Sequence, residues 1–269
     1  MTSTGTDGSD TEAALQAAID GLYEAFADHR RPGSFRACAC CWPGEPIEGD
    51  DGEVAVPAPG GDRPLRELAA VELGKVAGEV PPTTGSLAVV QHYLPRILEI
   101  VAGEGFGWPD REVVLGRLAH RPALDGQVWT NWPAAEHEAV RRFLHALWLH
   151  RLATPDDGIE HLVDETLCGI GLADPDIDWY LDTWLRFDEP AAAPHLQRFL
   201  IENAAHLRRG RLLDAHWSSA TPPAPENRQR VVAWVRSPAT KDAVAAAAEQ
   251  ARTPAEREAL EESYLRWLD

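Results

Sequence analysis

Long apolar stretches are missing from this chain of 269 residues. No run approaches the roughly 20 consecutive apolar residues that a helix needs to cross a bilayer. The first residues, MTSTGTDGSD, also lack the basic and apolar regions of a secretory signal. We therefore expect a soluble, cytoplasmic protein.

Positive charge is also scarce. Lysine occurs only at Lys75 and Lys241, and Lys and Arg together number 25 against 43 Asp and Glu, so the formal net charge is -18. The phosphate backbone of a nucleic acid and the surface of an anionic membrane would both repel such a chain. Neither a nucleic acid nor a membrane is therefore expected as the main partner.

Cysteine is too rare for a disulfide scaffold in a chain of this length, since only four are present. Cys38, Cys40 and Cys41 are crowded together, whereas Cys168 stands alone. The adjacent pair Cys40 and Cys41 cannot easily form a bridge without strain, and the expected compartment is reducing. Free thiols or metal ligands are therefore predicted.

Familiar catalytic motifs are absent as well. The sequence contains no H-E-x-x-H zinc-protease helix, no paired E-x-x-H of the di-iron bundles, no G-x-S-x-G and no G-x-x-x-x-G-K-[ST]. The sequence therefore predicts no catalytic residue, and we do not expect an enzyme.

Most of the chain shows the spacing of hydrophobic residues that is typical of helices. Hydrophobic residues make up 44% of the chain, and the 10 tryptophans add to a sizeable core. Apolar side chains recur at helical spacing, beginning with Leu15, Ile19, Leu22, Tyr23 and Phe26. No convincing strand alternation accompanies them, so the predicted fold class is all-α.

The predicted organisation is a disordered tail over 1–8 followed by a single helical domain over 9–269. Residues 45–64 are rich in glycine, proline and acidic side chains, which predicts a flexible acidic loop, although its GEVAV piece has the composition of a short strand. Helices rich in Leu and Arg recur at intervals of about 50 residues. Antiparallel helical hairpins are therefore expected, in an irregular solenoid-like stack or in a helical bundle.

The densest chemical feature is the segment from His29 to Cys41. Thiolate sulfur and imidazole nitrogen are ligands that zinc prefers, so zinc is the suggested cofactor. Structural zinc sites usually space two cysteines by two to four residues, and a C-x-C-C run is not expected to aim every sulfur at one metal. The candidate metal ligands are Cys38, Cys40, Cys41 and His29.

Two other interpretations of these cysteines stay open. Arg30, Arg31 and Arg36 lie close in sequence, and nearby positive charge favours a thiolate, which would make a cysteine nucleophilic or redox-active. Alternatively, the cysteines are small side chains that pack a loop onto the helices.

A second, weaker candidate lies farther along the chain. His161, Asp164 and Cys168 share helical spacing, which suggests a general base or a metal ligand set. A solvated His–acid pair beside a core cysteine explains the same pattern.

Several segments resemble an uncharacterised bacterial family of all-helical proteins with an N-terminal C-x-C-C cluster and a T-x-G…F-L-P-R-x-L-E-like segment. The family carries proline where this chain has Ala39. The resemblance spans most of the chain from residue 15 onward and implies no catalytic residue. The matching segments are 26–32, 38–41, 83–85, 93–99 and the W-P-x-x-E element at 132–136.

The leading functional prediction is a non-catalytic, helical binding protein of the cytoplasm with a protein or peptide partner. The prediction rests on the helical pattern throughout, the faint repeat and the missing catalytic motifs. The alternative is a zinc-binding or thiol-reactive protein that uses the C-x-C-C cluster.

Overall fold

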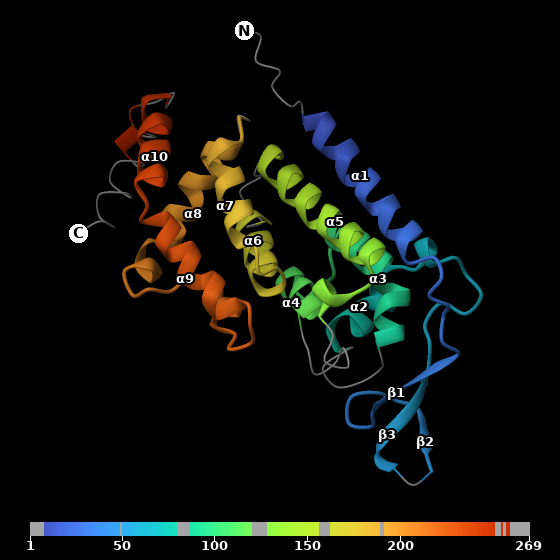
Figure 1. Cartoon of the computed structure of the whole chain (residues 1–269). Coiled ribbons are helices and arrows are strands. Elements are labelled where there is room, and N and C mark those ends of the chain that lie inside the picture. Colours follow the sequence, from blue (N-terminus) through green and yellow to red (C-terminus); the bar gives the residue numbers. More distant parts are fainter. Residues whose placement is uncertain are drawn as a thin grey trace. The chain divides into compact units, whose positions relative to one another are not determined.

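The computed structural model describes residues 8–48, 50–79, 87–119, 128–155, 162–188 and 191–250, together with Pro254, Arg257 and Glu258. Across these residues the chain is predominantly helical, as predicted, and carries one small sheet (Figure 1). Of the predicted tail only Gly8 is described, and it begins helix α1. No helix within the described ranges combines the length and the apolarity that crossing a membrane requires.

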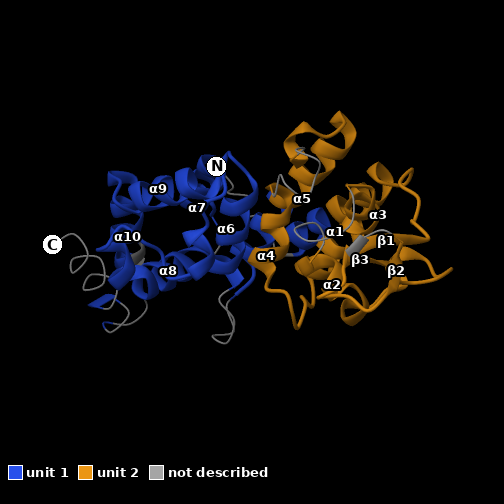
Figure 2. Ribbon diagram, turned by 90° about the horizontal axis from the view of Figure 1, so that it is seen from below, with its two compact units in different colours: residues 1–15, 145–269 blue, residues 16–144 orange. Residues whose placement is uncertain are grey.

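The chain forms two compact units (Figure 2). Unit 1 comprises residues 1–15 and 145–269, and unit 2 comprises residues 16–144. Helices α1 (Gly8–Ala25) and α5 (Ala134–Ala153) each contribute one end to each unit. The single domain over 9–269 stays a prediction.

Unit 2 combines the sheet with helices α2 (Ala70–Glu79), α3 (Leu87–Ala102) and α4 (Arg111–Gly116). Short 3-10 helices η1 (Leu65–Glu67), η2 (Arg117–Ala119) and η4 (Trp129–Asn131) lie between them in sequence. Its core contains side chains with no exposed surface, among them Leu22, Leu73, Tyr93, Leu98 and Leu115. Within α3, the buried side chains of Val90, Leu94, Ile97 and Val101 recur at helical spacing, which is the pattern that predicts a helix from the sequence.

The sheet corrects the all-α prediction. Strands β1 (Ser34–Cys38), β2 (Glu45–Ile47) and β3 (Asp50–Pro57) pair antiparallel in the order β1-β3-β2. On one face, Phe35 and Ala37 lie opposite Val56 and Val54, and all four side chains are buried. The flexible acidic loop predicted over 45–64 is therefore wrong for residues 45–47 and 50–57, which form strands.

Unit 1 contains helices α6 (Leu162–Ala173), α7 (Ile177–Arg186), α8 (Ala192–Leu207), α9 (Ala224–Val235) and α10 (Pro238–Gln250), with the 3-10 helix η5 (Ala215–Ser218). Aromatic rings from several helices form its core. The centre of the Trp184 ring lies 5.3 Å from that of Trp148 and 5.6 Å from those of Phe199 and Trp234. Buried tryptophans therefore join α5, α7, α8 and α9, as their positions on helix faces would suggest.

Candidate functional site

The predicted cysteines lie on a tight turn that directly follows β1. Cys38 is the last residue of that strand, and the backbone N–H groups of Cys41 and Trp42 both donate to its carbonyl oxygen at 3.0 Å. The N–H of Ala39 donates to the carbonyl of Gly52, also at 3.0 Å, which attaches the turn to β3. A hydrogen bond from residue i+3 back to residue i reverses the chain within four residues. The cysteine side chains are therefore brought back toward one another.

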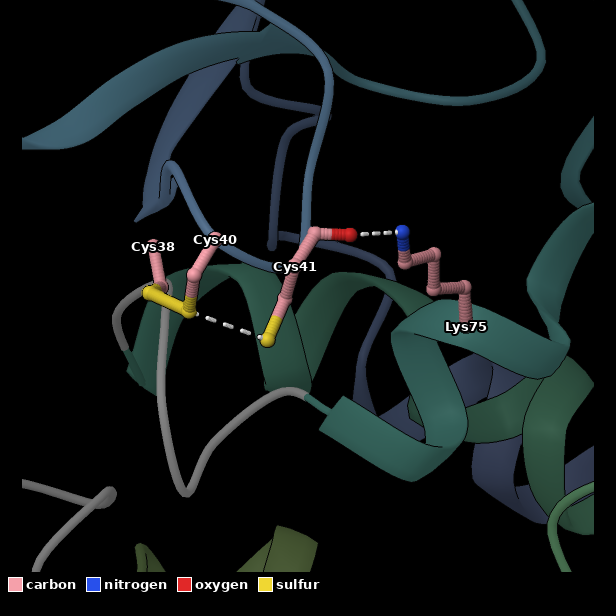
Figure 3. The surroundings of a disulfide bond; sticks show 4 residues. All are labelled: Cys38, Cys40, Cys41 and Lys75. Carbon is pink, nitrogen blue, oxygen red and sulfur yellow. Dashed lines mark hydrogen bonds between the residues drawn. A yellow bond between two sulfur atoms is a disulfide. The ribbon is translucent and has the colours of Figure 1, made fainter.

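The sulfur atoms of Cys38, Cys40 and Cys41 converge on the turn (Figure 3). All three Sγ atoms lie within 4.8 Å of one another. A disulfide joins Cys38 to Cys40, and the Sγ of the free Cys41 lies 3.4 Å from that of Cys40. Cys40 and Cys41 are exposed, and Cys38 is half-buried.

This geometry corrects one prediction about the cysteines. Of the three, only Cys41 is a free thiol, because a disulfide spans Ala39 and joins Cys38 to Cys40. The three sulfurs lie within 4.8 Å of one another, and the disulfide holds two of them together. The pattern that indicates this convergence is the C-x₂-C spacing from Cys38 to Cys41, which is the usual spacing in zinc sites.

Side chains behind the turn hold its backbone in place. Lys75 of α2 donates from Nζ to the carbonyl oxygen of Cys41 (Figure 3). The same Nζ lies 4.5 Å from the centre of the Trp42 ring, a cation–π contact. Trp42 is buried and packs edge-on against Phe35 of β1, with ring centres 5.3 Å apart. These contacts engage the backbone and the neighbours of the cysteines, so the sulfurs themselves remain accessible.

Two of the arginines near the cysteines, Arg31 and Arg36, have partners of their own. Arg36 pairs with Glu53, which lies opposite Cys38 in the strand register. Arg31 donates from Nη2 to the carbonyl oxygen of Arg63 at 2.6 Å. The positive charge of Arg36 is therefore balanced at the strand pair, which weakens the sequence argument that arginine activates a thiolate.

His29, the fourth predicted ligand, is placed elsewhere in unit 2. Its Nε2 lies 3.0 Å from Oε1 of Glu136, and Gln91 donates to the other carboxylate oxygen at 2.9 Å. Its backbone carbonyl accepts a hydrogen bond of 2.7 Å from Nδ1 of His92. Glu136 is 7% exposed, so a buried carboxylate with neighbouring donors explains where the imidazole lies.

The hydrogen bonds among His29, Gln91 and Glu136 join two of the segments that carry the family resemblance. His29 belongs to segment 26–32 and Glu136 to the W-P-x-x-E element, whereas segment 83–85 lies outside the described residues. The contacts give these segments a structural role, because they connect the end of α1 to the start of α5 within unit 2.

Two of the three residues in the second candidate set lie within the described part of the chain. His161 lies outside the described residues. Asp164 and Cys168 both lie on α6 and are buried, with exposed fractions of 8% and 0%. Nδ2 of the buried Asn203 lies 3.5 Å from the Asp164 carboxylate. Both side chains therefore belong to the core of unit 1.

Comparisons of the chain with protein-family models, with curated proteins and with solved structures found no match. The resemblance to the bacterial family stays a prediction.

Proposed function

We propose that the chain binds a soft metal ion, with zinc as the first candidate, through the sulfurs of Cys38, Cys40 and Cys41. The observation that supports this proposal is the convergence of all three Sγ atoms within 4.8 Å. Zinc–sulfur bonds are about 2.3 Å long, so two sulfurs on a tetrahedral zinc lie about 3.8 Å apart. The 3.4 Å between the sulfurs of Cys40 and Cys41 is close to that spacing, and reduction of the disulfide frees Cys38 to move to it.

Metal binding on this turn requires its reduced form. A dithiol reductant supplies the two electrons and two protons that convert the Cys38–Cys40 disulfide into two thiols, and is itself oxidised to a disulfide. The thiols then lose their protons as the metal binds. In the disulfide form only Cys41 offers a thiolate, and a single exposed ligand does not make a site.

A zinc ion on three sulfurs has one further position to fill. Among the residues that the structure describes, no histidine, cysteine or carboxylate joins the three sulfurs. Structural zinc sites are closed by four protein ligands, whereas three protein ligands with water at the fourth position leave the ion open. An exposed ion of this kind can take its fourth ligand from a partner molecule.

Zinc titration of the reduced chain against a chromophoric chelator tests the proposal. We expect one zinc per reduced chain and no comparable binding to the disulfide form. Replacing Cys38, Cys40 or Cys41 by serine should weaken zinc binding by more than about 100-fold, because losing an outer-shell partner alone costs about 10–100-fold.

Cys168→Ala is the matched control, since this buried cysteine lies on α6 of unit 1 and should leave zinc binding unchanged. A reduced chain that binds no zinc would overturn the proposal. If its Cys41 were then alkylated unusually fast, the thiol-reactive alternative would be favoured instead.

A protein or peptide partner for the helical hairpins, whether stacked as a solenoid or as a bundle, is a separate proposal with less support. Surfaces of this kind usually present a contiguous apolar patch of several hundred Å². Among the described residues, the large exposed apolar side chains belong to different elements and loops. They are Val71, Trp108, Ile201 and Leu213.

A further inference from the structure

Unit 1 contains a hollow of about 620 Å³ beside the end of α8, η5 and the start of α9. Pockets for small ligands typically enclose about 300–1,000 Å³. The hollow is thus large enough for a small organic molecule, and it belongs to unit 1, whereas Cys38, Cys40 and Cys41 belong to unit 2.

A well-defined turn shapes one side of the hollow. Helix α8 ends at Leu207, and Gly210 adopts a φ of 65°, in the left-handed region that glycine tolerates best. The N–H groups of Arg209 and Arg211 both donate to the carbonyl of His206, at 2.9 and 3.0 Å. These bonds place two arginines from one turn on the rim.

The next segment is fixed from the core. The fully buried Asn203 accepts a hydrogen bond of 2.7 Å from the backbone N–H of Leu213. Because a buried amide determines where this backbone runs, the wall is a built feature of the fold.

Positive charge predominates in the hollow, although the whole chain carries a net charge of -18. Arg209, Arg211 and Arg228 line it, against the single carboxylate of Asp214. That carboxylate already accepts from the backbone N–H and the Nδ1 of His216, at 2.7 and 3.1 Å. Hydrogen bonds within its own turn therefore already engage this carboxylate.

The arginines are available for a ligand. In the part of the chain that the structure describes, no hydrogen bond or ion pair engages the side chains of Arg209 and Arg211. Arg228 donates from Nη1 to the carbonyl of Trp217 at 2.9 Å, which orients its guanidinium and leaves further N–H donors. Positive charge at a helix end complements the helix dipole, but this explains only the two arginines that follow α8, because Arg228 belongs to α9.

Apolar side chains complete the lining. Leu212 and Trp217 are 5% and 1% exposed, and Leu213 is 42% exposed. The Nε1–H donor of Trp217 has no hydrogen-bond partner within the described residues. A ligand with both an anionic group and an apolar group would therefore match the hollow.

We propose that this hollow binds a small organic phosphate, in which a phosphate monoester is attached to an apolar or aromatic group. Three guanidiniums suit the three terminal oxygens and the double charge of a phosphate monoester better than the two oxygens of a carboxylate. Leu212, Leu213 and Trp217 contact the apolar part.

Isothermal titration of the full chain with phenyl phosphate, at low ionic strength, tests the proposal. We expect saturable binding that is tighter than that of benzoate and of inorganic phosphate, and no binding of phenol. Arg211→Gln and Arg228→Gln should each weaken binding by about tenfold or more, because a charge-assisted hydrogen bond contributes about 1.5–3 kcal/mol.

Arg230→Gln is the matched control, since this arginine also lies on α9 but contacts Asp178 and the carbonyl of Pro175. Its affinity for phenyl phosphate should equal that of the unchanged chain. Arg211 is exposed, so its replacement keeps the test valid even if the Arg228 variant folds poorly. The proposal is overturned if millimolar phenyl phosphate does not bind, if phenol binds equally well, or if Arg211→Gln has no more effect than the control.

Discussion

At the scale of single residues, His92 illustrates how burial controls a titration. Its Nδ1 donates to the carbonyl of His29, and its Nε2 is buried without a hydrogen-bond partner among the described residues. Burial lowers the pKa of this imidazole, the hydrogen bond to His29 raises it, and the neighbouring charges of Arg31 and His29 lower it further. The net effect is a pKa below the ordinary value, so His92 is neutral near neutral pH.

The shift at His92 predicts that acid destabilises unit 2. The unfolded chain binds a proton at His92 at higher pH than the folded chain does, so the free energy of unfolding falls as the pH drops below about 6.5. His92→Asn keeps an N–H donor for the His29 carbonyl but cannot titrate. Urea unfolding with a metal chelator present should therefore show a smaller loss of stability between neutral and acidic pH in this variant. An unchanged loss would contradict the assignment.

His29 and Cys41 show which parts of the site the sequence could predict. The C-x₂-C spacing can be recognised from the sequence alone, because a turn of four residues suffices to bring Cys38 and Cys41 together. Nearness in sequence to the cysteines is the only feature that makes His29 a candidate ligand. Its real partner, Glu136, is 107 positions away, and no local spacing indicates such a contact.

At the scale of elements, the helices were predictable and the sheet was not. Helix α3 repeats buried apolar residues over several turns, whereas β1 and β3 present only two inward residues each along their paired stretch. The strand that contains GEVAV pairs with Ser34–Cys38, a segment of five residues that ends at the first cysteine of the cluster. Short strands with distant partners leave too little periodicity to detect.

Gly44 tests whether the sheet supports the cysteine turn. A Cβ at this position would lie 2.6 Å from the Ala55 carbonyl oxygen and 3.0 Å from Cγ2 of Val54, so Gly44→Ala must displace the backbone of β3. We expect a loss of about 1–3 kcal/mol in the free energy of unfolding and weaker zinc binding by the reduced chain.

Gly33→Ala, immediately before β1, is the control for this substitution. Nothing lies within 4 Å of a Cβ at that position, so neither stability nor zinc affinity should fall. Urea unfolding and chelator competition measure both quantities. If both alanine variants had the same stability and the same zinc affinity, the sheet would not be supporting the cysteine turn.

At the scale of the whole molecule, each proposed site lies within one compact unit. The sulfurs belong to unit 2 and the arginine-lined hollow to unit 1, so either proposal can fail without the other. The helical spacing of apolar residues predicted the predominantly helical class, because most of the core is amphipathic helix. Composition gave no indication of the two units, since the residues that divide them lie inside α1 and α5.

Zinc binding by the cysteine turn is the central claim, and X-ray absorption at the zinc edge tests it most directly. The reduced chain, loaded with one zinc, should show three sulfur neighbours at about 2.3 Å and one oxygen or nitrogen neighbour at about 2.0 Å. Cys41→Ser should remove one sulfur from that shell. A shell made only of oxygen and nitrogen would contradict the claim, because the metal would then lie away from Cys38, Cys40 and Cys41.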